Sequence, residues 1–191
     1  MKIAIDLDRT IFYCKSFLYD VANYFANKRL SKRLSYIVLD RKRVEKPSKL
    51  SKVAAFFDAR KFIEIENATQ VINEWSRSGI EIILLSSRPN WKVMRQLTLD
   101  CLDQHKVECS AVIIGCKNKG LFCRENQVDL LIEDGIDICR AASKLQIPTI
   151  HFSYNRPKEY ADQVTAYSWK ELREMVEMRA EETAIAEETE K

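Results

Sequence analysis

The chain of 191 residues contains only four glycines and four prolines, too few for a linker-rich or low-complexity protein. No apolar run approaches the roughly 20 residues that a membrane-spanning helix requires. Basic residues exceed acidic ones by only three, so the net charge indicates no class of partner. Hydrophobic residues make up 46% of the chain, which at this length is enough for one globular domain with a sizeable core.

The cysteines form no Cys-x-x-Cys pair. Three of them recur every seven residues, a spacing that does not match the standard zinc sites. Because Met1 is followed directly by the first predicted strand, we expect no signal peptide and a cytoplasmic protein with reduced, mostly buried thiols. The six cysteines are Cys14, Cys101, Cys109, Cys116, Cys123 and Cys139.

Short apolar runs alternate with stretches of helical periodicity. The predicted strands are Lys2–Asp6, Glu81–Leu85, Ala111–Ile114, Leu130–Ile132 and Thr149–Phe152. The predicted helices are Ala68–Ser78, Trp91–His105, Gly120–Gln127, Ile136–Leu145 and Trp169–Glu182. This alternation predicts an α/β fold, with a mostly parallel sheet covered by helices on both faces.

The interval between the first two strands is too long for an ordinary crossover, which needs about a dozen residues plus loops. We therefore predict an α/β core from residues 1–11 and 68–170, interrupted by a small helical subdomain at 12–67. This insertion follows the first strand directly, so it should cover that strand's carboxyl end. Residues 171–191 are predicted to form a C-terminal helix and a frayed acidic tail.

The middle of the insertion is strongly basic. Between Lys28 and Lys52, ten basic residues stand against Asp40 and Glu45, a local charge of +8. This segment is either a solvated surface or an attractor for an anionic partner. Such a partner could be a phosphate ester, a nucleic acid or an acidic membrane surface.

Two carboxylates, Asp6 and Asp8, end the first predicted strand. Strand alternation places both on the same side of the chain. Two like charges so close together are unfavourable unless a cation or a shared proton lies between them. The pair therefore predicts a metal site or paired acid/base chemistry at the carboxyl end of a strand, where open α/β sheets bind ligands.

Polar residues also follow the next three strands. Ser86 and Ser87 end the second strand, Lys117 and Lys119 follow the third, and Glu133-Asp134 end the fourth, with Asp137 close behind. Each has an ordinary explanation as a helix cap or a surface charge. Their shared position at successive strand ends nevertheless predicts a single site.

These motifs resemble the haloacid dehalogenase (HAD) superfamily of phosphohydrolases, from Ile3 to about Phe152. The resemblance is carried by Asp6-x-Asp8-x-Thr10, the strand ending in Ser86, Lys119, and the strand ending in Glu133-Asp134. The segment 119–134, with Tyr154-Asn155-Arg156-Pro157, is similar to the 5′-nucleotidase type C-like branch.

The resemblance implies a phosphomonoester hydrolase that works through an aspartyl-phosphate on Asp6. Asp8 would protonate the leaving group and then activate water, and Thr10 would brace the loop between them. Ser86 would donate a hydrogen bond to a phosphoryl oxygen, with Ser87 as the alternative. Lys119 would neutralise charge. We prefer it to Lys117 because the stretch from Lys119 to Glu133 accommodates one helix and one strand.

The resemblance also implies Mg²⁺ as cofactor. Asp6, the backbone carbonyl of Asp8, and Asp134 would be its ligands, with Glu133 or Asp137 in the outer shell. The position between Asp8 and Thr10 is usually glycine in the superfamily but is Arg9 here. If its φ is positive, this substitution costs roughly 1 kcal/mol or more.

In this superfamily an insertion after the first strand is a cap that selects the substrate. The basic cap favours a small phosphorylated substrate, a nucleotide or a sugar phosphate. Two alternatives remain open. One is a phosphatase acting on nucleic-acid ends, and the other is a catalytically weak HAD-fold protein that binds an anionic partner through its basic insertion.

Overall fold

A computed structural model describes the chain except for residues 15–61, 89, 91, 155–159 and 190–191. The predicted helical subdomain and its basic segment therefore lie mostly outside the described residues. The strands are β1 (Lys2–Asp6), β2 (Phe12–Cys14), β3 (Phe62–Glu64), β4 (Glu81–Ser86), β5 (Ala111–Ile114), β6 (Leu130–Glu133), β7 (Thr149–Phe152) and β8 (Thr165–Ala166). The helices are α4 (Ala68–Arg77), α5 (Lys92–Gln104), α6 (Lys119–Glu125), α7 (Ile136–Ser143) and α8 (Trp169–Thr189).

Six strands form one parallel sheet in the order β5-β4-β1-β6-β7-β8. The first strand lies in the middle of the sheet, where Ile3 is paired with Ile82 on one side and with Leu130 on the other. The chain order reverses at β1, because the chain first adds strands on one side of it and then on the other. Ligands of open α/β sheets bind at such a switch point, outside the carboxyl ends of the strands.

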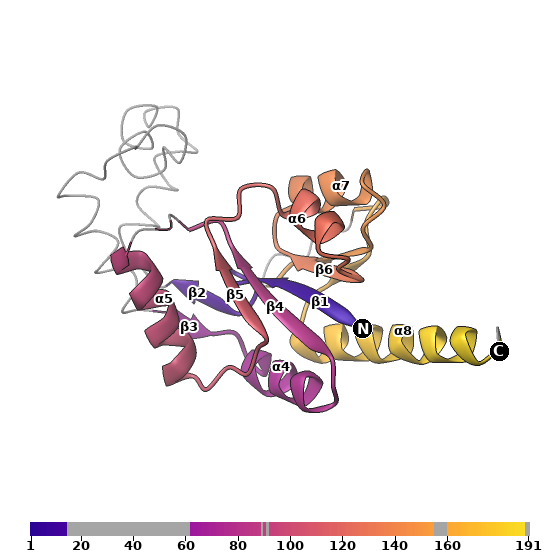
Figure 1. Ribbon diagram of the computed structural model, residues 1–191, viewed down its shortest axis with the longest axis horizontal. Helices are drawn as coiled ribbons and strands as arrows, with labels where there is room; N and C mark the ends of the chain where they lie inside the picture. Colours follow the sequence, from indigo (N-terminus) through magenta and orange to yellow (C-terminus); the bar gives the residue numbers. More distant parts are fainter. Residues whose placement is uncertain (15–61, 89, 91, 155–159, 190–191) are drawn as a thin grey trace.

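Helices cover both faces of the sheet, as predicted. Alternate residues of the central strands point to opposite faces, and two separate cores result. Ile3 and Ile5 belong to the core formed with α4, α5 and α8, which includes Trp75 and Trp169. Ala4 belongs to the core formed with α6 and α7. Figure 1 shows α4 and α8 on the side of the sheet away from α6 and α7.

The two ends of the insertion form strands, where helical structure had been predicted for 12–67. Strand β2 pairs antiparallel with β3, so that Phe12 faces Glu64 and Cys14 faces Phe62. The backbone N–H of Ile65 donates to the carbonyl of Ile11 at 2.8 Å. Aromatic and β-branched residues dominate both segments, and such residues favour strands. This small ribbon joins the insertion to the loop after β1.

Two other elements differ from the prediction. Strand β8 adds a sixth strand to the sheet, and its two residues are too few to produce a periodic pattern. Helix α8 runs to Thr189, beyond the predicted end at Glu182, because alanine and glutamate in its last turns are strong helix formers. None of the helices within the described residues is long and apolar enough to span a membrane.

Candidate active site

Three carboxylates meet at the carboxyl end of the sheet. Asp6 ends β1, Glu133 ends the neighbouring β6, and Asp134 follows it. One oxygen from each lies within 4.8 Å of the others. Asp6 and Glu133 are buried, and Asp134 is partly exposed. The cluster forms because β1 and β6 are adjacent parallel strands whose carboxyl ends lie at the same edge.

Lys119, the first residue of α6, lies between two of these carboxylates. Its Nζ donates to Oδ1 of Asp6 and to Oε2 of Glu133, the latter at 2.5 Å. The side chain is only 3% exposed. Asn118 caps the helix by accepting a hydrogen bond from the backbone N–H of Leu121 at 3.0 Å. Lys117 is exposed, so the structure brings Lys119 to Asp6 and leaves Lys117 at the surface.

Burial dominates the electrostatics of this cluster. Desolvation raises the pKa of Asp6 well above its ordinary value, and the Glu133 carboxylate raises it further against the opposing charge of Lys119. Desolvation also raises the pKa of Glu133 to about 7, although the nearby charge of Lys119 lowers it. It raises the pKa of Asp134 as well, although the charge of Arg9 lowers it. Burial alone lowers the pKa of Lys119, but Asp6 and Glu133 outweigh this effect and raise it. The cluster is thus short of positive charge.

The donors fit a hard divalent cation. Mg²⁺ prefers carboxylate and other oxygen ligands, and its charge would offset the desolvation that raises the three pKa values. Glu133 belongs to the cluster itself, whereas the family resemblance implied Glu133 or Asp137 in the outer shell. Asp137 lies away from it, with 96% of its side chain exposed and Arg140 at 3.9 Å. Asp6 and Asp134 are brought together as predicted; Asp8 is not part of this carboxylate group.

The Asp8 carboxylate is bound by an arginine that the sequence analysis did not single out. Nε of Arg88 lies 3.1 Å from each Asp8 oxygen, and Nη2 lies 2.7 Å from Oδ1. Arg88 is buried, whereas 41% of the Asp8 side chain is exposed. A signal was present in the sequence, because Arg88 stands two residues after Ser86 at a strand end.

Ser86 and Ser87 have different environments. Ser86 is fully buried, and its Oγ accepts a hydrogen bond from the backbone N–H of Arg88 at 3.1 Å. The Ser87 hydroxyl donates to the carbonyl of Cys116 at 3.1 Å. Both therefore brace the turn after β4.

Arg9 adopts the left-handed backbone conformation, with φ 65°. Few residues other than glycine, asparagine and aspartate do so, and such strain often accompanies a functional site. Its guanidinium is half exposed and lies 3.5 Å from Oδ2 of Asp134. In the same loop Thr10 is buried, and within the described residues its Oγ1 has no hydrogen-bond partner. The backbone carbonyl of Thr10, not its hydroxyl, anchors the loop by accepting from Trp169.

A small cavity of about 180 Å³ adjoins the acidic cluster. It is lined by Arg9, Asp134, Ile136, His151, Phe152, Ser153, Tyr154 and Tyr160. His151 is buried, with Nε2 3.1 Å from the carbonyl oxygen of Asp134. The cavity therefore combines cationic, aromatic and polar groups beside the carboxylates.

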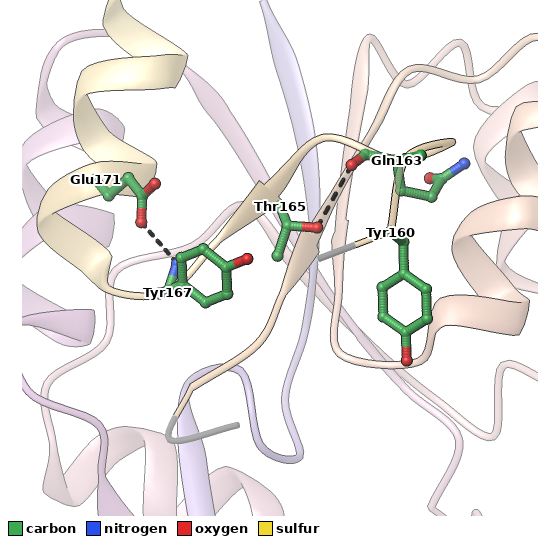
Figure 2. A pocket seen from close by; sticks show the side chains of 6 residues that line it. Tyr160, Gln163, Thr165, Tyr167 and Glu171 are labelled. Carbon is green, nitrogen blue, oxygen red and sulfur yellow. Dashed lines mark hydrogen bonds between the residues drawn. The ribbon is translucent and has the colours of Figure 1, made fainter. Parts of the chain in front are cut away.

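A larger hollow of about 590 Å³ lies along β8 and the start of α8. Figure 2 shows its lining, where the Glu171 carboxylate accepts a hydrogen bond from the backbone N–H of Tyr167 at 2.7 Å. Tyr160 lines both hollows, but the larger one includes none of the clustered carboxylates. Of these two hollows, only the smaller one is lined by a carboxylate of the acidic cluster, Asp134.

Comparison with known proteins gives matches in structure alone. No protein-family model and no curated protein sequence matches the chain. A HAD phosphatase from Thermococcus onnurineus superposes with a TM-score of 0.63 at 17% identity, covering 92% of this chain and 98% of that one. A HAD family hydrolase from Deinococcus radiodurans, solved with phosphate and sodium, superposes with a TM-score of 0.61 at 13% identity. The superposition covers 92% of this chain and 94% of that one.

The D,D-heptose 1,7-bisphosphate phosphatase of B. bronchiseptica, complexed with magnesium and phosphate, gives a TM-score of 0.52 at 9% identity. The superposition covers 94% of this chain and 99% of that one. At these identities the likeness concerns the fold. The resemblance to the 5′-nucleotidase branch stays a prediction, since these three structures are described as phosphatases or hydrolases. The sheet order, the two helical layers and these superpositions establish that the chain has the HAD fold.

Proposed function

We propose that this protein is a Mg²⁺-dependent phosphomonoester hydrolase that forms an aspartyl-phosphate on Asp6. The observation that carries the proposal is the contact between the Asp6 carboxylate and Lys119, next to Glu133 and Asp134 at the switch point of the sheet. A carboxylate attacks a phosphate ester only when the negative charge of both is offset. This cluster combines a candidate nucleophile with a buried cation and candidate metal ligands.

In the proposed reaction an Asp6 oxygen attacks phosphorus in line with the departing alkoxide. The P–O bond to the leaving group breaks, and Asp8 supplies the proton that the alkoxide takes up. The resulting Asp8 carboxylate then removes a proton from water, which attacks phosphorus and releases inorganic phosphate and Asp6. The Lys119 ammonium stabilises charge on the phosphoryl oxygens, and we assign Ser86 a hydrogen bond to one of them.

Asp6, Asp134 and Glu133 would hold the metal, with the predicted carbonyl of Asp8 as a further ligand. When bound, Mg²⁺ supplies positive charge next to the phosphoryl oxygens. The fit of the donor set supports this assignment, because three carboxylates with raised pKa values lack sufficient compensating charge.

The substrate class is a small phosphorylated molecule, with nucleotides and sugar phosphates as the leading candidates. The cavity beside Asp134 carries Arg9, Tyr154 and Tyr160. The Arg9 guanidinium could bind an anionic leaving group, and the two tyrosine rings could stack on a planar leaving group such as a nucleobase. The comparison phosphatase that acts on a heptose bisphosphate supports the sugar phosphates.

One observation favours a different function, a catalytically weak protein that binds an anionic partner. The Arg9 guanidinium lies 3.5 Å from Oδ2 of Asp134, one of the groups assigned to metal binding. If this ion pair persists in the presence of Mg²⁺, Asp134 is not available as a metal ligand and turnover will be negligible.

The test is phosphate release from a panel of nucleoside monophosphates, sugar phosphates and an aryl phosphate, with Mg²⁺ or with EDTA. We expect hydrolysis that requires Mg²⁺ and falls at least about 10³-fold in Asp6→Asn. The matched control is Asp100→Asn, an exposed aspartate of α5, which should retain full activity. Mass spectrometry of acid-quenched protein should find the phosphoryl adduct on the Asp6 peptide. Full activity in Asp6→Asn would exclude the proposed nucleophile.

A further inference from the structure

The ion pair between Asp8 and Arg88 is unusually well constrained. Two nitrogens of Arg88 donate to the Asp8 carboxylate over 2.7 to 3.1 Å. The arginine side chain is 8% exposed and the aspartate side chain 41%. The guanidinium therefore holds the carboxylate from the interior of the protein and leaves part of it accessible to solvent.

Two other elements hold the guanidinium itself. Its Nη1 donates to Oγ1 of Thr98 in α5 at 2.9 Å, and the Thr98 hydroxyl donates to the carbonyl of Met94 at 2.8 Å. The ring of Phe62 in β3 lies against the guanidinium, with its centroid 4.1 Å from Cζ of Arg88. A planar guanidinium can make forked, lateral and stacked contacts at once, which an ammonium group cannot.

From this geometry we infer that Arg88 is a positioning residue for Asp8 and that Phe62, at the base of the insertion, completes the same clamp. The inference rests on the proposed function, in which Asp8 exchanges a proton with the leaving group. Such a group must lie within hydrogen-bond distance of the atom it protonates.

A double-mutant cycle between Asp8 and Arg88 tests this inference on an alkyl phosphate. In the natural background, Arg88→Gln should lower kcat by about 10- to 100-fold and change KM by less than about threefold. In the Asp8→Asn background the same substitution should change kcat by less than about twofold. An equal loss in both backgrounds would mean that Arg88 acts independently of Asp8, which overturns the inference.

Further variants separate positioning from charge and from packing. Arg88→Lys keeps the charge but loses the planar fork, so its kcat should fall nearly as far as that of Arg88→Gln. Full activity in Arg88→Lys would contradict a role for the fork. Phe62→Leu should give a smaller loss that also disappears in the Asp8→Asn background. Arg77→Gln, an exposed arginine paired with Glu108, serves as the control and should leave kcat unchanged.

A crystal structure of Arg88→Gln provides a readout that needs no activity. We expect the Asp8 carboxylate to leave its present position, and an unmoved carboxylate would overturn the inference. If Arg88→Gln does not fold, a crystal structure of Arg88→Lys answers the same question, because this variant keeps the positive charge and the Asp8 carboxylate but loses the planar fork. A protein that hydrolyses nothing in the panel refutes the proposed function, whereas this structural comparison still decides whether Arg88 positions Asp8.

Discussion

The indole N–H of Trp169 donates to the backbone carbonyl of Thr10 at 2.8 Å, so the first turn of α8 is bonded to the loop that carries Asp8. The two residues are 159 positions apart in the sequence. Trp169 is buried, and its ring lies 5.9 Å from that of Trp75 in α4. The position of the loop that carries Asp8 thus depends on the last helix of the fold.

Removing this hydrogen bond should destabilise the protein measurably. Trp169→Phe leaves the Thr10 carbonyl without its partner, whereas the indole N–H of Trp75 has no partner within the described residues. Both tryptophans are almost fully buried, so the loss of ring volume is similar. We expect Trp169→Phe to lower the free energy of unfolding by about 1–3 kcal/mol more than Trp75→Phe. Urea denaturation measures the difference, and equal losses would refute the prediction.

Lys119 should be essential for stability as well as for activity. Lys119→Met leaves the buried carboxylates of Asp6 and Glu133 without their cation. Removing one partner of a buried ion pair typically costs about 3–5 kcal/mol, and we expect a loss of this order at pH 8. The loss should be smaller at pH 5, where Glu133 is protonated because its pKa is raised to about 7. Lys117→Met, on an exposed neighbour, should change the free energy of unfolding by less than about 0.5 kcal/mol.

Magnesium binding should strengthen as the pH rises. Burial raises the pKa of Glu133 to about 7, and this carboxyl must lose its proton before it can bind a metal ion. We expect the association constant for Mg²⁺ to rise about tenfold between pH 6 and pH 8 and to level off above pH 8. Calorimetry in two buffers with different ionisation enthalpies should detect the released proton. A pH-independent constant would exclude Glu133 as a ligand.

The metal-free protein should show the opposite trend in stability. The folded state holds a proton on Glu133 up to pH about 7, whereas the unfolded chain releases it near the ordinary value of 4.5. The raised pKa of Glu133 therefore contributes fully to the free energy of unfolding below pH 4.5, and this stabilisation is lost as the pH rises through about 7. In EDTA, the free energy of unfolding should fall between pH 5 and pH 8. Added Mg²⁺ should restore stability at pH 8.

The left-handed backbone at Arg9 can be tested with a pair of substitutions. Both Arg9→Gly and Arg9→Ala remove the guanidinium, but only alanine keeps a Cβ at φ 65°. The free energy of unfolding of Arg9→Gly should therefore exceed that of Arg9→Ala by roughly 0.5–1 kcal/mol. At Arg95, an exposed residue within α5, the order should reverse, with alanine more stable by about 1 kcal/mol. The same order at both positions would refute a strained conformation at Arg9.

The core of the fold was accessible from local patterns. Buried apolar runs identify the strands, and three of the five predicted strands have the observed bounds, Lys2–Asp6 among them. The strand-end argument also placed Asp6, Lys119 and Asp134 at one site, which the structure brings together. Such patterns work because the carboxyl ends of parallel strands must share an edge. Polar residues at the ends of adjacent parallel strands therefore lie close to one another.

The sequence by itself therefore determined five strands of the parallel sheet, the two helical layers and the residues near the switch point, since these follow from periodicity and parallel connections. Only the tertiary structure decided which charges pair. It placed Glu133 inside the acidic cluster, joined Arg88 to Asp8 across 80 positions, and formed the β2–β3 ribbon. Side-chain pairing depends on distances of a few ångströms between segments far apart in the chain, and no local pattern encodes those distances.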